Sequence, residues 1–181
     1  MARTPPEILD ALRHDQQVHL RKLLEQNPID LNDAEVVCDQ YGIDDPDEIP
    51  LLFWAVQSDI SREAIEILMA YGLDITWTNR EGLGALDIAI KNRRRDLVDL
   101  CVEHGVPLTE SRRRSGLTPL MLAASFGDKE MVDYLLECGA PIDAADKRGM
   151  DAIEYARLLG QIRMKEYLEE KRESQKEKQG V

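Results

Sequence analysis

Apolar positions recur at helical spacing in two short runs in the C-terminal half of the chain, and a polar break separates them. Thr118 and Pro119 precede the first run, as an N-cap and a first helical residue do, and Gly127 follows it. The second run begins after Asp128 and ends before Gly139, where a helix-ending glycine is free to adopt positive φ. The apolar members are Leu120, Leu122, Ala123, Ala124, Met131, Val132, Leu135 and Leu136. Helices of about seven to ten residues are too short to be stable alone, so each predicts a packed neighbour.

The same unit recurs along the chain. Gly116 follows Gly82 by 34 positions, and Gly149 follows Gly116 by 33. A second glycine series keeps this period at Gly72, Gly105 and Gly139. A period near 33, with a turn and two helices in each copy, resembles the ankyrin repeat. The resemblance is carried by Gly116-Leu117-Thr118-Pro119-Leu120, Ala123-Ala124, Gly127, Leu135-Leu136 and Gly139-Ala140.

The resemblance implies an all-α fold, an ankyrin-repeat solenoid of about five helix-pair units with β-turn fingers. Its first and last units are expected to act as caps with polar outer faces. We expect the ankyrin-repeat domain to occupy residues 1–173 and a disordered tail to occupy residues 174–181. The expected units span about 4–31, 47–76, 79–109, 113–144 and 146–172.

Some positions depart from the regular pattern. Thr4, followed three residues later by Glu7, predicts a capped start for the first helix. In the third unit Gly84-Ala85 stands where the family has Thr-Pro, which is expected to cost that helix roughly 1 kcal/mol. In the same unit Asp87 replaces a frequent His, and Arg93 replaces a usual Gly.

Residues 32–49 interrupt the period with an excess of about twelve residues, at the place of the first finger. The segment contains no Lys or Arg, and its carboxylates are Asp33, Glu35, Asp39, Asp44, Asp45, Asp47 and Glu48. Two interpretations remain open: an acidic finger ordered at least in part by packing of Val36, Val37 or Tyr41, or a solvated, tolerated insertion. The segment lacks the loop glycine and final glutamate of an EF-hand, so it does not predict a calcium site.

Composition and charge reduce the number of function classes that the chain could belong to. The chain has 181 residues and a formal net charge of −12, which argues against general binding to nucleic acid or to an anionic membrane. Its three cysteines match no zinc spacing, and residues 1–10 lack a signal-peptide core, so we expect a reducing, cytoplasmic location. Its three histidines are scattered and no nucleophile has a phased base. We therefore expect no enzymatic activity, no cofactor, no metal site and a monomeric chain.

The resemblance implies that a partner protein binds at the finger tips and at the exposed side of the inner helices. The predicted partner-binding residues are Trp77, Arg80, Glu81, Leu83, Arg112, Arg113, Arg114, Leu117, Ser125, Phe126, Lys147, Arg148 and Met150. For Trp77, contact with a partner and structural packing are equal alternatives. The fingers toward the C-terminus are basic, so we expect them to meet an acidic patch or loop, with Leu117 and Phe126 as apolar anchors. The alternative is that these charges only keep the edge soluble.

Two roles are consistent with this surface. The first is a non-catalytic interaction module or adaptor that binds a partner through the fingers and the concave inner-helix face. The second is a dedicated inhibitor or immunity-type protein that occludes one enzyme, with the acidic segment at 32–49 entering a basic cleft. Nucleic-acid binding through the arginine-rich fingers is disfavoured by the overall negative charge.

Overall fold

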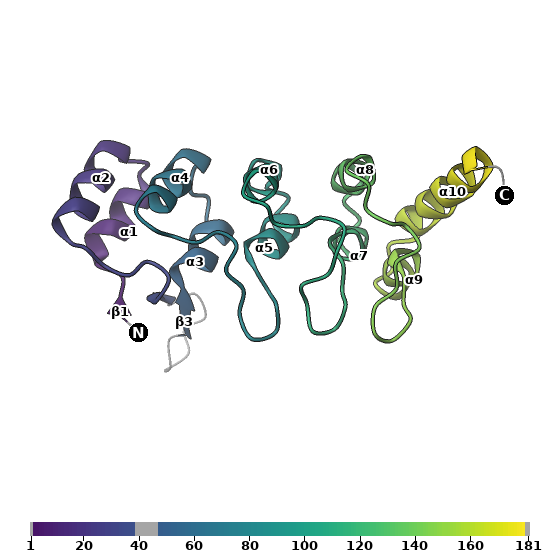
Figure 1. Ribbon diagram of the computed structural model, residues 1–181, viewed down its shortest axis with the longest axis horizontal. Coiled ribbons are helices and arrows are strands. Elements are labelled where there is room, and N and C mark those ends of the chain that lie inside the picture. The colour runs from purple at the N-terminus through teal and green to yellow at the C-terminus, as the bar shows by residue number, and fades with distance from the viewer. Residues whose placement is uncertain (1, 39–46, 180–181) are drawn as a thin grey trace. The chain divides into compact units, whose positions relative to one another are not determined.

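A computed structural model describes residues 2–38 and 47–179 of the chain. The chain divides into two compact units, Met1–Trp77 and Thr78–Val181. Short helices connected by loops dominate each unit (Figure 1), in agreement with the expected all-α fold class.

The Met1–Trp77 unit contains four helices among its described residues. They are α1 (Pro6–Arg13), α2 (Gln17–Gln26), α3 (Leu51–Gln57) and α4 (Arg62–Ala70). Helix α3 is buried from Leu51 to Val56, which makes it the centre of this unit. The buried Trp54 ring lies beneath the Arg13 guanidinium, whose carbon is 5.5 Å from the ring centroid. Trp54 therefore packs inside the unit and adds a cation–π contact between α1 and α3.

A small sheet completes this unit, although the helical periodicity did not predict it. Strand β1 (Ala2–Arg3) pairs in parallel with β2 (Ala34–Cys38), and β3 (Asp47–Pro50) pairs antiparallel with β2. Val36 lies opposite Ile49 and is almost completely buried. The base of the acidic segment is thus ordered by strand pairing and by packing of Val36. The expected contribution of Tyr41 lies outside the described residues.

The first helix does not begin as the sequence predicts. The Thr4 hydroxyl donates a hydrogen bond to the Glu35 carbonyl at 3.0 Å, and the Thr4 N–H donates to the same oxygen at 2.9 Å. The residue at the N-cap position of α1 is Pro5, which provides no side-chain cap. A local capping box would have used the Thr4 hydroxyl to cap α1. In the structure this hydroxyl is bonded to β2 instead, at a residue 31 positions away.

The Thr78–Val181 unit contains three consecutive helix pairs. Its helices are α5 (Ala85–Lys91), α6 (Arg95–Glu103), α7 (Pro119–Ser125), α8 (Lys129–Glu137), α9 (Ala152–Leu158) and α10 (Ile162–Gln179). Helix α7 packs against α5, α8 and α9, and all of its residues are buried. Three loops, at 78–84, 111–117 and 145–151, precede α5, α7 and α9 and project from the same edge of the unit (Figure 1). They are called fingers 1, 2 and 3 below, and the acidic segment at 32–49 is not included in this numbering.

The starts of α7 and α5 can be compared directly with the capping that the sequence predicts. The Thr118 hydroxyl accepts the Met121 N–H at 3.3 Å, as expected for an N-cap. Helix α5 begins after Gly84, which has no side chain to cap it. Instead, the Asp87 carboxylate accepts the Gly84 N–H at 2.9 Å. The aspartate that replaces the frequent histidine therefore offsets part of the expected loss.

The C-terminal boundary needs correction. The expected disordered tail at 174–181 overlaps α10, which continues through Gln179. The overlapping residues are Ser, Gln, Lys and Glu, with no Gly or Pro before Gly180. Extending an existing helix through such residues costs little, because propagation fixes one residue for each new hydrogen bond.

A charged cluster joins α10 to α8. The Asp133 carboxylate accepts a hydrogen bond from the Tyr167 hydroxyl and forms ion pairs with Lys129 at 2.8 Å and Lys171 at 3.2 Å. The two ammonium groups lie 4.3 and 5.2 Å from the Tyr167 ring centroid. Burial raises the pKa of Asp133, but the hydrogen bonds from Lys129, Tyr167 and Lys171 outweigh it and lower the pKa to about 2.

We expect this cluster to make stability depend on pH in the acid range. The folded pKa of Asp133 is below the ordinary unfolded value of about 3.9. Its contribution to the free energy of unfolding is therefore present above about pH 4 and is lost as the pH falls toward about 2. Asp133→Asn should flatten this part of a urea-unfolding pH series, whereas Glu130→Gln, at an exposed site on the same helix, should not. An equally steep loss in Asp133→Asn would contradict the assignment.

Leu135 is completely buried in α8, while its neighbour Leu136 is only half-buried. Leu135→Ala should lower the free energy of unfolding by about 2–5 kcal/mol, because it removes apolar contacts and leaves a cavity. Leu136→Ala is the matched control and should cost clearly less. The measurement is the urea midpoint of each variant, and equal losses would mean that the helix faces are misassigned.

Candidate functional site

Fingers 1 and 3 are held by the same arrangement. In finger 1 the Asn79 side-chain oxygen accepts the N–H groups two and four residues further on, both at 3.0 Å. In finger 3 the Asp146 carboxylate accepts the N–H groups at the same two offsets, at 2.8 and 2.9 Å. The N–H of Met150 and the Tyr155 hydroxyl hold the pKa of Asp146 below its ordinary value. Each of these two turns is therefore fixed by the side chain of its second residue.

Finger 2 lacks this side-chain anchor, because Arg113 occupies the position that Asn79 has in finger 1 and Asp146 has in finger 3. Other hydrogen bonds hold its turn. The Ser111 hydroxyl accepts the Arg113 N–H at 3.1 Å and donates to the Leu117 carbonyl at 2.6 Å. The Arg113 guanidinium donates to the Asp87 carboxylate at 2.9 Å, and its side chain is only 25% exposed. Arg113, predicted as a partner contact, is thus engaged inside the unit.

Backbone hydrogen bonds join the three fingers into one edge. The Arg114 N–H donates to the Glu81 carbonyl at 3.0 Å, which ties finger 2 to finger 1. The Lys147 N–H donates to the Ser115 carbonyl at 3.0 Å, which ties finger 3 to finger 2. We call fingers 1 to 3 together the finger edge. Its tips hold a fixed spacing because main-chain groups, rather than long side chains, connect them.

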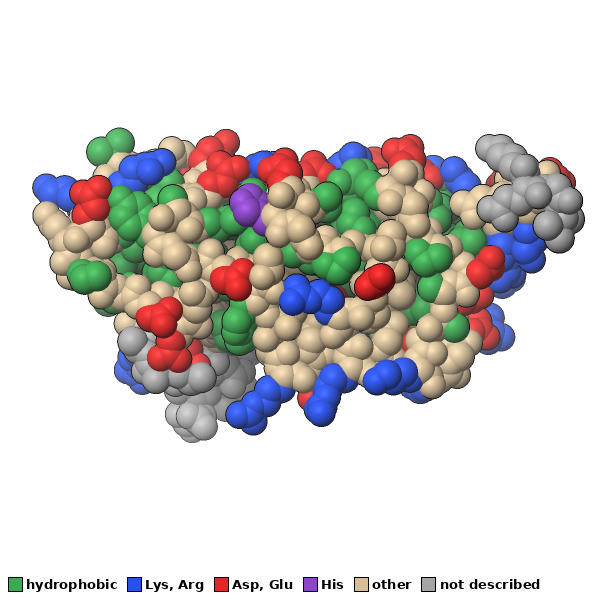
Figure 2. All heavy atoms as spheres, viewed as in Figure 1, with side chains coloured by type: hydrophobic (Ala, Val, Ile, Leu, Met, Phe, Trp, Pro, Cys, Tyr) green, Lys and Arg blue, Asp and Glu red, His purple; other side chains and the backbone are tan. Residues whose placement is uncertain are grey.

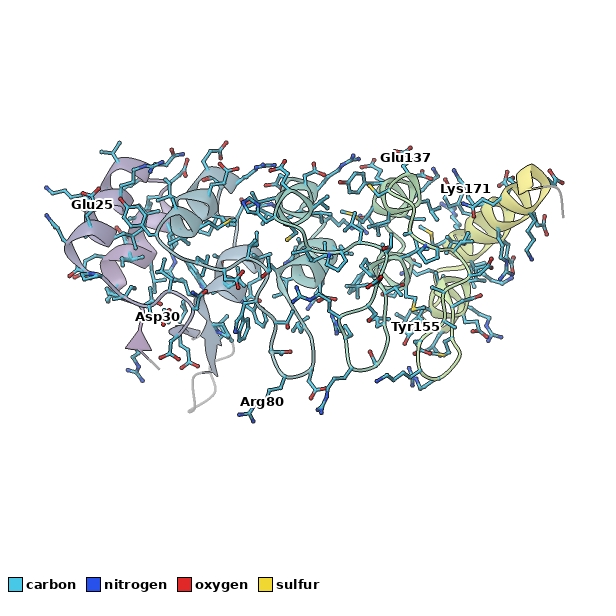
Figure 3. All side chains as sticks on the ribbon, viewed as in Figure 1. Glu25, Asp30, Arg80, Glu137, Tyr155 and Lys171 are labelled. Carbon is cyan, nitrogen blue, oxygen red and sulfur yellow. The ribbon has the colours of Figure 1, made fainter. Side chains whose placement is uncertain are left out.

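The finger edge is strongly basic. Its exposed cations are Arg80, Arg112, Arg114, Lys147 and Arg148. Figure 2 shows Lys and Arg side chains gathered along this edge, and Figure 3 shows Arg80 extending away from its loop. The one exposed carboxylate among these tips, Glu81, lies 3.3 Å from Arg114, and both side chains are largely in solvent. Such a pair contributes little stability, so the edge keeps a surplus of positive charge on a chain whose net charge is −12.

Apolar side chains lie within the fingers and at the opposite end of α7. The predicted residues Leu83, Leu117 and Met150 are half-buried, one in each finger, and Phe126 is half-buried just after α7. Ser125 is corrected: it is buried, and its hydroxyl donates to the Leu122 carbonyl at 2.7 Å. It occupies the inside of the helix end and is not available to a partner.

Sequence reasoning missed two exposed leucines at the end of α9. Leu158 is 65% exposed and Leu159 is 54% exposed. A signal for them existed, because they precede Gly160 as Ser125-Phe126 precedes Gly127. The two turns lie together, since a Cβ built on Gly127 would be 2.4 Å from the Gln161 side-chain oxygen. The apolar part of the surface therefore continues from Phe126 toward the end of α9.

Trp77 belongs to the Met1–Trp77 unit. Its ring is half-buried and lies 5.4 Å from the Phe53 ring, centroid to centroid, at an interplanar angle of 59°. This tilted contact is a favourable aromatic pair. The arrangement favours the packing interpretation of Trp77 over partner contact.

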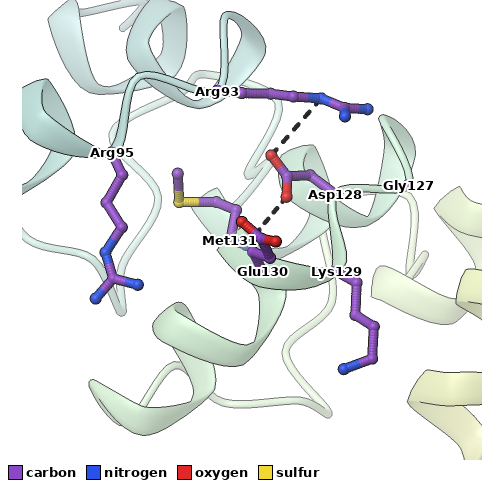
Figure 4. A pocket seen from close by; sticks show the side chains of 7 residues that line it. All are labelled: Arg93, Arg95, Gly127, Asp128, Lys129, Glu130 and Met131. Atoms are coloured by element: carbon purple, nitrogen blue, oxygen red, sulfur yellow. Dashed lines mark hydrogen bonds and ion pairs between the residues drawn. The ribbon is translucent and has the colours of Figure 1, made fainter.

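A depression of about 270 Å³ lies at the start of α8 (Figure 4). It is lined by Arg93, Arg95, Gly127, Asp128, Lys129, Glu130 and Met131. Arg93 adopts φ +56°, in keeping with its place at a glycine position, and its Nε lies 3.8 Å from the Asp128 carboxylate. The Arg95 guanidinium stacks 3.9 Å from the Tyr134 ring centroid. These cations are engaged with neighbouring groups of the same unit.

Residues 2–38 and 47–179 contain no group of three or more His, Cys, Asp or Glu side chains arranged to hold a metal ion. Within the same residues no helix has both the length and the apolar character needed to cross a bilayer. Cys101 is buried, and burial together with the nearby Asp87 carboxylate raises the pKa of its thiol to about 12. This thiol stays protonated at neutral pH and belongs to the core.

Residues 115–147 match the family model described as Ankyrin repeat. The chain is 30% identical over 95 residues to Ankyrin repeat and SOCS box protein 6 of Pongo abelii, covering 51% of this chain and 23% of that protein. It is 26% identical over 100 residues to human Neurogenic locus notch homolog protein 2, covering 55% of this chain and 4% of that protein. It is 30% identical over 125 residues to Glycerophosphocholine phosphodiesterase GDE1 of Candida albicans, covering 68% of this chain and 11% of that protein. The chain thus spans less than a quarter of the length of each of these relatives.

The finger contacts generate a prediction for paired glycine variants. Gly82 and Gly139 have similar positive φ values of +77° and +88°, so a β-carbon strains both backbones similarly. A Cβ at Gly139 meets nothing within 4 Å, whereas one at Gly82 would lie 2.0 Å from the Arg112 carbonyl oxygen. Gly139→Ala should cost about 1–2 kcal/mol and Gly82→Ala at least about 1 kcal/mol more, measured by urea unfolding. Equal losses would show that fingers 1 and 2 are not in contact.

Proposed function

The chain is an ankyrin-repeat protein, and from this premise we propose that its finger edge binds an acidic patch or loop of a partner protein. Ankyrin repeats are general protein–protein interaction modules. The single observation that carries the finer proposal is the row of five exposed cations on a backbone-locked edge, Arg80, Arg112, Arg114, Lys147 and Arg148.

The free energies of ion pairs and of apolar burial differ, so the charged and apolar parts of the surface would contribute differently to binding. An exposed ion pair contributes about 0–1 kcal/mol, so the cations mainly steer and orient an acidic partner. Burying a large apolar side chain contributes about 1.5–3 kcal/mol. Leu117 in finger 2, together with Phe126, Leu158 and Leu159 at the C-terminal ends of α7 and α9, would therefore supply most of the affinity, while the basic tips select the partner.

A protein partner fits this charge pattern better than a nucleic acid does. These five cations lie together on one edge of a chain with a net charge of −12, so a long polyanion would also meet repulsion from the rest of the chain. An acidic loop has a few carboxylates within reach of the finger tips and avoids that repulsion. The spacing set by the finger-to-finger hydrogen bonds gives such a loop a defined register.

The second candidate role is an inhibitor that uses the acidic segment at 32–49. The observation in its favour is the β2–β3 ladder, which together with buried Val36 gives this segment an ordered base. An acidic segment on an ordered base would suit a basic cleft in an enzyme. This role uses the Met1–Trp77 unit, so it is separable by mutation from binding at the finger edge.

We also propose that the chain acts without catalysis, as a monomer, in the cytoplasm. Support for a reducing compartment is the cysteine pattern, in which the Cys101 thiol is buried and Cys138 is exposed as a free thiol. Support for a non-catalytic role is the use of charged groups in turn anchors and ion pairs, such as Asp146 in finger 3 and the Arg113–Asp87 pair.

The test of the finger-edge proposal compares two double charge reversals of equal size. Arg114→Glu with Arg148→Glu changes the finger edge, and Arg163→Glu with Lys176→Glu changes exposed positions on α10. Partners captured quantitatively from source-cell lysate by the native chain at about 50 mM salt should fall by about tenfold or more with the finger variant. That corresponds to about 1.4 kcal/mol, and the α10 variant should retain them.

Loss of capture with both variants, or with neither, would contradict binding at the finger edge. A third variant tests the inhibitor role: the segment 39–46 is replaced by a Gly-Ser linker of the same length. Selective loss of one enzyme partner with this variant alone would support inhibition through the acidic segment.

A further inference from the structure

We propose that Ser115, at the tip of finger 2, is a phosphorylation site for an arginine-directed serine kinase. We further propose that the phosphate switches off acidic-partner binding at the finger edge. The modification rests on the local chemistry of finger 2. Only its consequence rests on the proposed function.

The residues before Ser115 match what an arginine-directed kinase selects. Such kinases have acidic substrate clefts that pair with arginines just before the target serine, above all three positions before it. Arg112 stands three positions before Ser115, and Arg112 and Arg114 are both exposed. Arg113 is engaged with Asp87, so recognition would use the two outward-facing arginines.

The Ser115 hydroxyl is more accessible than the serine hydroxyls near it. Ser111 donates its proton to the Leu117 carbonyl at 2.6 Å, and buried Ser125 donates its own to the Leu122 carbonyl at 2.7 Å. Ser115 is exposed, and its hydroxyl oxygen accepts a long hydrogen bond of 3.3 Å from the Leu117 N–H. The oxygen that must attack a phosphate is therefore at the surface and only weakly held.

The transfer itself needs ATP and the kinase. The Ser115 oxygen attacks the γ-phosphorus of Mg²⁺-bound ATP and forms the new O–P bond. The bond between that phosphorus and the bridging oxygen of ADP breaks, and ADP leaves with the electron pair. The hydroxyl proton passes to the catalytic base of the kinase.

The new phosphate would arrive beside the cations of finger 3. The Ser115 carbonyl accepts the Lys147 N–H at 3.0 Å, so the two tips adjoin, and the Lys147 and Arg148 side chains are exposed. A phosphoserine has a charge of about −1.5 to −2 and three acceptor oxygens, and it forms strong hydrogen bonds to such cations. Five exposed cations, set against Glu81 and against Asp146, which pairs with Arg148 at 3.6 Å, leave a surplus of three positive charges, and one phosphate would cancel about half of it or more.

A competing serine provides an internal control. Ser174 follows Lys171-Arg172-Glu173 and is also exposed. It lies within α10, however, and Lys171 and Arg172 form ion pairs with Asp133 and Asp151, each at 3.2 Å. A kinase cleft would have to unwind the helix and break these pairs. The geometry therefore favours Ser115 over Ser174.

The first experiment incubates the full chain with ATP and the catalytic subunit of cyclic-AMP-dependent protein kinase, with site mapping by mass spectrometry. We expect about one phosphate per chain on Ser115, abolished in Ser115→Ala and retained in Ser174→Ala. Arg112→Ala should lower the rate about tenfold or more, whereas Arg163→Ala should leave it unchanged. Absence of phosphate from Ser115, while a linear peptide of residues 109–120 is modified, would overturn the site. So would preferential modification of Ser174.

The second experiment measures the consequence with a defined probe, a fluorescent glutamate-rich peptide, at about 50 mM salt. Phosphorylation of the native chain should weaken binding of this peptide about fivefold or more, and kinase treatment of Ser115→Ala should not. Equal binding before and after modification would overturn the switch. If the unmodified chain fails to bind the peptide at all, the finger-edge function and the switch fail together, while the mapped phosphate on Ser115 still stands.

Discussion

Burial of apolar faces between consecutive helices is the interaction on which the rest of this protein depends. Helices of seven to nine residues, such as α5 to α9, are too short to persist alone. Helix α7 shows the solution, because every one of its residues is buried among α5, α8 and α9. A helix stabilised only by its neighbours transmits its position to the loops at its ends, which is why the fingers can hold a fixed spacing.

The packed helices support the finger edge, which is a chemically distinct surface. Main-chain hydrogen bonds from Arg114 to Glu81 and from Lys147 to Ser115 connect the tips, so the spacing of the tips does not depend on their exposed cations. Three consecutive arginines then take different roles. Arg113 forms an ion pair with Asp87 inside the unit, whereas the Arg112 and Arg114 side chains are exposed. A single finger therefore combines a structural ion pair with an accessible basic tip.

Placing positive charge on one edge of an acidic chain has consequences for binding. Under the proposed function, the edge would attract an acidic partner from a distance, while the net negative charge of the chain would repel polyanions that cover more of the molecule. Because the attraction comes from a few exposed cations, a change of two charges alters a large fraction of it. Electrostatic binding of this kind would be easily tuned, whereas the apolar side chains near Phe126 and Leu158 would supply a contribution to the proposed binding that charge leaves unaffected.

The sequence by itself determined the repeat, the helix pairs and most of the caps, because period, capping residues and glycine turns act within a few positions of one another. Thr118 and Arg93 behave as their local pattern predicts. Tertiary structure decided the rest. The β1–β2 pairing took the Thr4 hydroxyl, Asp87 took the Arg113 guanidinium, and the end of α7 buried Ser125. Each of these depends on which groups packing brings together or removes from water, and local spacing contains no information about that.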